Sequence, residues 1–277
     1  MNNVFKLTIC TLFLAGLGVF FFVGCSGDSS TSPGESLTFT YDNIWPPIEG
    51  NSWEFSLHNQ IFETEGDLYS TPEEIPGLPT MESLYADIQN DDWGAPTSVA
   101  RGNWSLLFSD NGSEIEGTTV LAVSNTTEML EGIPRRPYPF WVGQSWTHSG
   151  DQISFSSAEV TVWVLLQGGL TPGNSFSAEL PSWGRTMYLN SLIGPIRSIN
   201  VMDQEYSNCL ECFYVLDGGI QTVVNEIEEI EGYFRQYFYG IIVYAPDVGP
   251  VFCQERYMGG PGHWENRKAT LQAFGNN

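Results

Sequence analysis

Positive charge is scarce in this sequence. Lys and Arg together number 10 against 33 Asp and Glu, so the formal net charge is −23. Phosphate backbones and anionic lipid headgroups are repelled by such a chain. This composition argues against nucleic acid as a partner and against a basic patch as the means of reaching a membrane. The acidic surface is interpreted as a solvated one.

Short catalytic and cofactor motifs are also lacking. There is no G-x-S-x-G elbow, no P-loop and no dinucleotide fingerprint, and His58, His148 and His263 do not have a metal-binding spacing. The sequence therefore predicts no catalytic residue, no metal ligand and no cofactor. The lack of motifs does not exclude paired carboxylates. The carboxylate pair of a glycoside hydrolase is recognised by a separation in space of about 5–10 Å and not by sequence spacing.

Helical periods are few, whereas strand patterns are frequent. Trp53, Phe55 and Leu57 alternate with polar residues, which is typical of a strand with one buried face. Only 81–88 has helical spacing. Further strands are predicted where β-branched and aromatic residues gather, at 103–108, 118–123, 159–166, 213–216, 233–244 and 269–274. The segment 221–231 also fits a helix face, but its position between a Gly-Gly turn and an aromatic strand favours a strand. Turn residues predict breaks between strands, at 110–112, 167–169, 217–219 and 246–250.

The fold class predicted from these patterns is all-β, with antiparallel sheets that form a curved sandwich or half-barrel. Gly-Asn-Ser-Trp53 and Gly-Gln-Ser-Trp146 are related motifs, each with a proline upstream. This echo predicts two related sub-sheets, over about 37–132 and 133–277. Trp53 and Trp146 are expected to fill the core, with ligand contact as the alternative. Five more aromatic residues are candidates for the core or for a cleft: Trp104, Trp163, Trp183, Tyr237 and Tyr239.

The N-terminal segment has the order of a secretory signal, in which Lys6 precedes an apolar stretch over 7–23. That stretch is at the lower limit for a membrane-spanning helix, which is the alternative. Phe22-Val23-Gly24-Cys25 resembles the lipobox of bacterial lipoproteins. The resemblance implies a signal peptide over 1–24, acyl chains on Cys25 and a flexible tether over 25–36. Ser26 is similar to the residue that follows the cysteine in outer-membrane lipoproteins.

Three cysteines remain in the predicted β-rich domain over 37–277: Cys209, Cys212 and Cys253. In an oxidising compartment this odd number allows one disulfide and one free thiol. Positions three apart on a strand face opposite ways, so Cys209 and Cys212 are poorly placed to bond with each other. A bridge from either of them to Cys253 is one prediction, and three buried free thiols are the alternative.

Several motifs together resemble a group of uncharacterised exported bacterial β-domain lipoproteins. That group has repeated G-[N/D/Q]-x-W strands and a Y-A-P-G-V-G-like turn, and this chain has the two tryptophan motifs and Tyr244-Ala-Pro-Asp247-Val-Gly249. Asp247 replaces the glycine usual in the group. The resemblance implies a β fold and an envelope location, and it implies no activity.

The function predicted from the sequence is a lipid-anchored cell-envelope protein, most simply a non-enzymatic binding or structural module. Its expected partners are the membrane, reached through the acyl anchor, and a protein, a glycan or an apolar ligand. The alternative is an envelope carbohydrate hydrolase that uses paired carboxylates.

The lipobox gives a direct test. Replacing the anchor residue, Cys25→Ala, is expected to leave an unprocessed precursor without lipid, because the acylated thiol is what the signal peptidase of lipoproteins requires. Metabolic labelling with a fatty acid and membrane fractionation measure both effects. Normal processing and membrane retention of the variant would contradict the anchor.

Overall fold

The computed structural model describes residues 38–44, 46, 50–66, 68–110, 115–120, 145–149, 152–157, 160–182, 185–225, 227 and 229–276. The predicted signal peptide, the tether and Cys25 lie outside these residues. The fold below belongs to one unit, Phe39–Asn277. No helix of the described part is long and apolar enough to cross a membrane.

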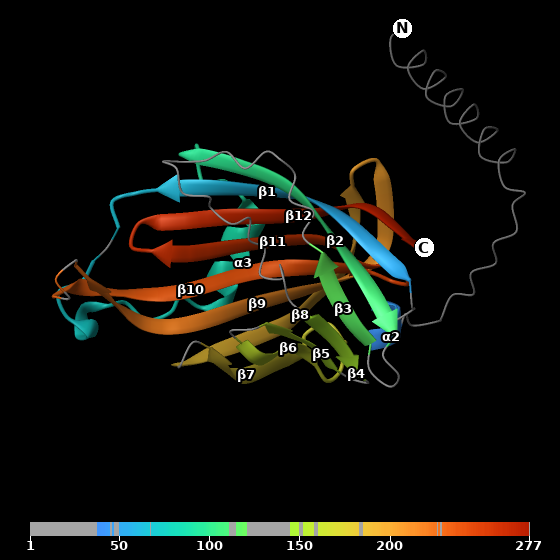
Figure 1. Cartoon of the computed structure of the whole chain (residues 1–277), viewed down its shortest axis with the longest axis horizontal. Coiled ribbons are helices and arrows are strands. Elements are labelled where there is room, and N and C mark those ends of the chain that lie inside the picture. Colours follow the sequence, from blue (N-terminus) through green and yellow to red (C-terminus); the bar gives the residue numbers. More distant parts are fainter. Residues whose placement is uncertain are drawn as a thin grey trace, which may run out of the picture. The chain divides into compact units, whose positions relative to one another are not determined.

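The described strands form one antiparallel sheet of twelve, which confirms the all-β class (Figure 1). Their order is β6-β5-β4-β3-β2-β1-β12-β11-β10-β9-β8-β7, so each strand except β6 and β7 lies between two hydrogen-bonded neighbours. The strand bounds are β1 (Asn51–Glu63), β2 (Ser98–Asp110), β3 (Ile115–Val120), β4 (Ser145–Ser149), β5 (Gln152–Ser157), β6 (Val160–Gln167), β7 (Ser175–Ser182), β8 (Arg185–Val201), β9 (Gln204–Val224), β10 (Ile230–Ala245), β11 (Gly249–Gly260) and β12 (His263–Asn276).

The first and last strands are neighbours. β1 and β12 pair along their whole lengths, from Asn51 opposite Asn276 to Glu63 opposite His263, with one irregularity after Glu54. Strands from both halves of the chain therefore belong to one sheet. The suggested division near residue 132 lies outside the described residues, and β3 and β4 on either side of it pair with each other.

The helical prediction over 81–88 is confirmed by α3 (Met81–Asn90). Thr80 is its N-cap, because the side-chain Oγ1 accepts from the backbone N–H of Ser83 at 3.3 Å. Two short elements, α2 (Tyr41–Ile44) and the 3₁₀ helix η1 (Pro72–Glu74), complete the described helices.

The turn predicted at 217–219 is wrong, because these residues form a bulge within β9. Asp217 pairs with Tyr237 and Gly219 pairs with Gln236, which leaves Gly218 as an extra residue. The backbone N–H of Gly219, whose φ is 71°, donates to Oδ1 of Asp217 at 2.9 Å. The residue types at 217–219 are thus those of a turn, but here they bend β9 without ending it. β9 ends at Val224 and β10 begins at Ile230, so the chain reverses inside the segment 221–231, for which the sequence favours a single strand.

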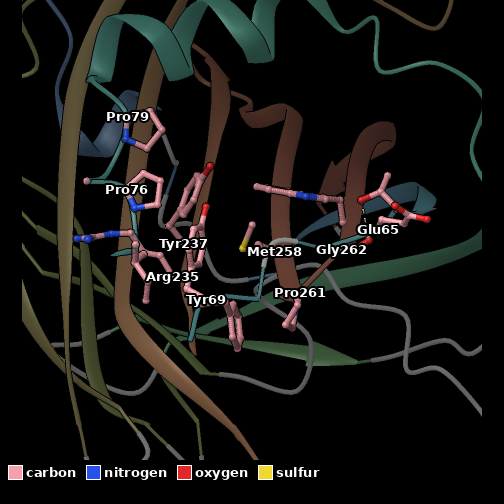
Figure 2. A pocket seen from close by; sticks show the side chains of 15 residues that line it. Glu65, Tyr69, Pro76, Pro79, Arg235, Tyr237, Met258, Pro261 and Gly262 are labelled. Atoms are coloured by element: carbon pink, nitrogen blue, oxygen red, sulfur yellow. Dashed lines mark hydrogen bonds between the residues drawn. The ribbon is translucent and has the colours of Figure 1, made fainter. Parts of the chain in front are cut away.

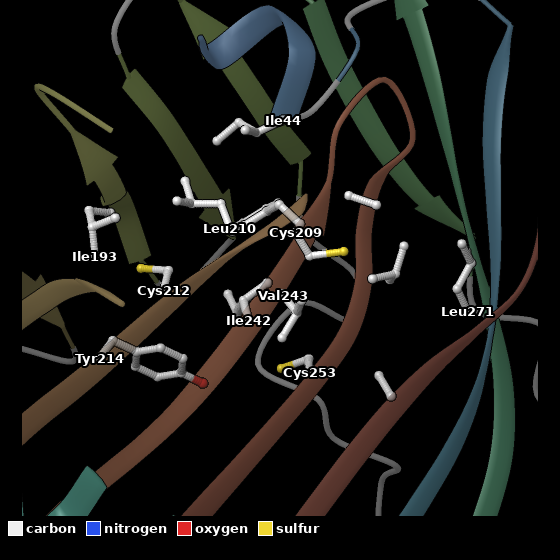
Figure 3. Close-up of a cluster of buried hydrophobic side chains, with 14 of the residues drawn as sticks. Ile44, Ile193, Cys209, Leu210, Cys212, Tyr214, Ile242, Val243, Cys253 and Leu271 are labelled. Atoms are coloured by element: carbon white, nitrogen blue, oxygen red, sulfur yellow. The ribbon is translucent and has the colours of Figure 1, made fainter. Parts of the chain in front are cut away.

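Hydrophobic side chains pack on both faces of the sheet. On one face α3 contributes Leu84 and Ile88 to a cluster with residues of β9 and β10. On the other face α2 contributes Tyr41 and Ile44 to a larger cluster, which Figure 3 shows around Leu210, Ile242 and Val243. Continuous buried runs in β9 and β10 follow from this double coverage.

Trp53 is a fully buried member of the larger cluster. Its indole Nε1 donates to the backbone oxygen of Val248 at 2.5 Å, in the turn between β10 and β11. Gly249 has φ of 107° and lies against the indole, where a Cβ atom would come within 2.9 Å of Nε1. Trp53 thus joins β1 to a turn that lies beyond β12 and β11 in the sheet.

Truncating this side chain is expected to destabilise the fold strongly. Trp53→Ala should lower the free energy of unfolding by about 3–5 kcal/mol, because it leaves a cavity and an unpaired carbonyl at Val248. Trp53→Phe should cost less. Phe274→Ala is the matched control, since that ring touches Trp53 but is 37% exposed. Urea titration of the unlipidated mature chain measures all three, and equal losses for the Trp53→Ala and control variants would contradict the assignment.

Candidate functional site

A long connection runs from the end of β1 to the start of α3 and crosses the ends of β10, β11 and β12. We call residues 64–79, Asp67 excepted, the strap. It forms one side of a pocket of about 270 Å³. Figure 2 shows Pro76 and Pro79 of the strap on one side, Tyr69 and Tyr237 together, and Met258 near the centre. Fifteen residues line the pocket: Thr64, Glu65, Gly66, Tyr69, Ile75, Pro76, Gly77, Pro79, Phe234, Arg235, Tyr237, Met258, Pro261, Gly262 and Trp264.

Backbone hydrogen bonds hold the strap in place at two points. The N–H of Thr64 donates to the oxygen of Gly262 at 2.8 Å, at the hairpin between β11 and β12. Tyr69 and Tyr233 exchange two backbone hydrogen bonds of 2.9 Å each. The strap is therefore bound to the sheet on both sides of the pocket.

Three glycines allow the strap to lie this close. A Cβ atom on Gly66 would come within 2.1 Å of the backbone N of Gly262, and one on Gly262 within 2.2 Å of the backbone oxygen of Thr64. A Cβ atom on Gly232 would come within 2.5 Å of the Leu68 side chain. Backbone meets backbone at the first two contacts, so any side chain there would lift the strap and open the pocket.

The inner wall of the pocket is aromatic and rigidly supported. Tyr237 meets Trp264 edge to face, with ring centroids 5.6 Å apart, and stacks beside Tyr239 at 6.0 Å. Behind this wall the guanidinium of Arg256 lies 4.0 Å from the centroid of Trp93 and 4.9 Å from that of Trp264. A cation held between two indoles fixes the orientation of Trp264.

α3 is attached to the same wall by hydrogen bonds. The carboxylate of Asp87 accepts from the hydroxyl of Tyr239 and from Nη1 of Arg256, the latter at 3.1 Å. Asp91 accepts from Gln254 at 2.8 Å and also from Lys268. The strap is thereby anchored at its far end as well, because α3 follows it directly.

The ionisable groups of the pocket are few. Arg235 lines it with its side-chain stem, and in Figure 2 the guanidinium points away from Met258. That guanidinium binds Asp217 at 2.6 Å and is neutralised by it. Burial raises the pKa of Tyr237, so its hydroxyl stays protonated and can donate. Glu65 is the single carboxylate among the lining residues.

A separate charged cluster lies on the other face of the sheet, where β1, β11 and β12 meet. Arg267 donates to Glu255 at 3.1 Å through Nη1 and to Glu265 at 3.0 Å through Nε. His263 bridges Glu265 at 3.1 Å and Glu63 at 2.8 Å. Burial raises the pKa of Glu255. Burial also opposes ionisation of Glu265, but hydrogen bonds from His263 and Asn59 and the charge of Arg267 outweigh it and lower its pKa to about 2.

This cluster contains a pair of buried carboxylates of the kind that a hydrolase would need. Glu255 and Glu265 have different pKa values, as an acid and a base should. However, one guanidinium lies between them and binds both, at the place where a glycosidic oxygen would have to enter. We interpret the cluster as structural, because it joins three strands through ionic hydrogen bonds.

Cys209, Cys212 and Cys253 are free and buried in this structure. This arrangement is the alternative to a disulfide that the sequence analysis left open. Ile242 of β10 pairs with Cys212 on one side and with Cys253 on the other. Two strand spacings, about 10 Å, therefore separate Cys212 from Cys253, which is beyond the reach of a disulfide. The expectation that Cys209 and Cys212 face opposite ways is not met, since both belong to the same cluster (Figure 3).

Burial also makes these thiols poor nucleophiles. It raises the pKa of Cys209 to about 11 and that of Cys212 to about 12, and the pKa of Cys253 rises as well. A thiol with such a pKa is protonated at neutral pH. Within the described residues no group of three His, Cys, Asp or Glu could hold a metal ion.

Of the aromatic residues named from the sequence, Tyr237 lines the pocket and Tyr239 supports it. Trp53 lies in the core and away from this pocket. The side chains of Trp104, Trp146, Trp163 and Trp183 lie outside the described part. No local sequence pattern points to Tyr69 or to the three glycines, because their roles depend on contacts between distant segments. Trp264 lies five residues before the strand predicted at 269–274, and its aromatic side chain is the local signal for it.

Comparisons with known proteins give a limited result. The chain matches no protein-family model and no curated protein. Two solved structures have a similar outline. A candidate lipoprotein from Parabacteroides distasonis is 11% identical, with a TM-score of 0.39 over 87% of this chain and 100% of that one. A candidate exported protein with a YmcC-like fold from Bacteroides fragilis is 12% identical, with a TM-score of 0.34 over 86% and 100%.

The charged cluster predicts a specific acid sensitivity. A carboxylate whose pKa is lowered on folding stabilises the protein above its unfolded pKa, and that stability is lost as the pH falls toward the folded pKa. Glu265→Gln should therefore lower the free energy of unfolding by about 3 kcal/mol at pH 7 and by much less near pH 2. Glu54→Gln, at an exposed position of β1, is the control. A loss that did not change with pH would contradict the assignment.

Proposed function

We propose that this protein is exported, is anchored in the cell envelope by acyl chains on Cys25, and binds a saccharide unit in the strap pocket without catalysing a reaction. The lipobox-like sequence supports the anchor, and the polar segment after it supports a tether that separates the folded domain from the bilayer. The acidic composition is consistent with an anchor that does not depend on charge.

The observation that carries the binding role is the preformed aromatic pocket. Its shape is fixed by the backbone contacts at Gly66, Tyr69 and Gly262, so little ordering is needed when a ligand enters. Its volume, about 270 Å³, is just below the range of sites for drug-sized molecules. A single ring or one unit of a longer chain is therefore the fitting size.

The lining favours a sugar ring among ligands of that size. A pyranose presents an apolar face of C–H groups, which packs on aromatic rings such as Tyr237 and Trp264. It also presents hydroxyl groups at its rim, which can donate to Glu65 and accept from Tyr237. A purely apolar ligand would leave these polar groups without partners when it displaced water.

Hydrolysis is less well supported. The pocket has one lining carboxylate, whereas acid and base catalysis on a glycoside uses two. A buried pair of carboxylates, Glu255 and Glu265, is bound to Arg267 on the other face of the sheet.

The binding role is tested by titrating the unlipidated mature chain with chito-oligosaccharides, cello-oligosaccharides and muropeptides while tryptophan fluorescence is recorded. At least one of these probes should bind, and Tyr237→Ala should weaken it by about tenfold or more, because the ring supplies much of the contact area. Tyr188→Ala removes an exposed aromatic side chain of β8 and should have no effect.

Three outcomes of this titration would count against the proposal. If no saccharide bound, the proposed ligand class would be wrong. If the wild type and Tyr237→Ala bound equally well, the strap pocket would not be the binding site. Cleavage of a bound oligosaccharide would instead favour the hydrolase.

A further inference from the structure

The tip of the hairpin between β9 and β10 exposes an unusual number of large apolar side chains. Nine such residues are exposed in the described part, and four of them lie here: Ile220 (45%), Val224 (54%), Ile227 (73%) and Ile230 (56%). A fifth, Leu68, is 41% exposed and lies on the strap. Scattered single apolar residues are normal on a protein surface, but a gathering of this kind marks an interaction site.

Four of these residues belong to the hairpin tip and Leu68 belongs to the strap beside it, and we call the five the tip patch. Val224 and Ile230 are paired across the hairpin. Ile220 lies on the same face of β9 as Val224, because the two are four positions apart on a strand. Leu68 packs against Gly232, two residues beyond Ile230. Figure 1 shows the hairpin, in orange, projecting at one end of the sheet with the strap beside it.

The tip patch is held in a defined shape. Oδ1 of Asn225 accepts from the backbone N–H groups of Ile227 at 3.0 Å and Glu229 at 2.9 Å. The N–H of Asn225 donates to the oxygen of Glu229 at 2.9 Å. Below the turn, the paired backbones of Tyr69 and Tyr233 tie the hairpin to the strap. A surface fixed in this way loses little conformational entropy when it is covered.

The described charged residues next to Ile230 are acidic. Glu229 and Glu231 are exposed on either side of Ile230. Arg235, the cation that faces Ile220 across the hairpin, is bound to Asp217. An apolar centre with a charged border is the usual arrangement of a protein interface, and the sign of the border selects the partner.

From these contacts we propose that the tip patch docks a second protein whose surface has an apolar hollow bordered by Lys or Arg. The apolar hollow would receive Ile227 and Ile230, and the basic border would pair with Glu229 and Glu231. A second copy of this chain would bring the same acidic border and be repelled, and an anionic bilayer would be repelled for the same reason. This inference is independent of the saccharide site.

The first experiment places the photoreactive amino acid p-benzoylphenylalanine at position 227 in the full lipidated chain, in its own membranes. Irradiation should give one major adduct with another protein, and the same probe at position 188 on β8 should not give it. An adduct with lipid, an adduct with a second copy of the chain, or no adduct at all would each overturn the proposal.

The second experiment decides whether an adduct reflects docking of the stated chemistry. The crosslinked protein is purified, and its affinity for the unlipidated mature chain is measured at two salt concentrations. Ile230→Ser should weaken binding by about tenfold or more. The pair Glu229→Lys and Glu231→Lys should weaken it by a similar factor and reduce its salt dependence.

Controls separate this surface from the pocket. Tyr188→Ser, at an exposed aromatic residue of β8, should leave the affinity unchanged, and so should Tyr237→Ala, which removes a wall of the saccharide site. Binding that survives Ile230→Ser, or that is strengthened by the charge reversals, would overturn the proposal whatever the outcome at the pocket.

Discussion

The pairing of β1 with β12 is the constraint on which the other features depend. It brings Ser52 beside Gly275, 223 residues away in the chain. The same pairing sets Glu63 opposite His263, so that the strap leaves β1 at the hairpin it must cross. It also carries Trp53 into the cluster beneath the turn at Val248. The pocket, the core and the charged cluster are consequences of one register between two distant strands.

The pocket and the charged cluster use this register in different ways. On one face the strap lies against glycine backbone and leaves a small aromatic hollow. On the other face Arg267 gathers two carboxylates from β11 and β12 and links them, through His263, to β1. The hairpin between β11 and β12 therefore contributes to both the pocket and the charged cluster. Its residues alternate between the two because successive side chains on a strand face opposite ways.

Much of the fold could be predicted from local sequence patterns, because alternation and turn residues act within a few positions. The strand at Trp53, the helix from Met81 and the turn at Asp247 were all visible in this way. The bulge at Gly218 was not, since a bulge and a hairpin turn use the same residue types. The site was only partly visible. Tyr237 stood out as an aromatic residue in a strand, but Gly66 and Gly262 matter only because they meet.

The same limit applies to the cysteines. Spacing along one strand says nothing about which strand comes next in the sheet, and the insertion of β10 between Cys212 and Cys253 separates them. Electrostatic pairing was equally hidden, because Glu255, Glu265 and Arg267 are ordinary charged residues until three strands are placed side by side.

The closure of the sheet by its final strand has a consequence for how the molecule is made. Contacts of such long sequence separation form slowly, and those between β1 and β12 can form only after β12 has been synthesised. Hairpins such as β9–β10 and β10–β11 join strands that follow one another in the chain, so they can form before β1 pairs with β12. The pairing of β12 with β1 therefore joins the two groups of strands into one sheet as a late step of folding.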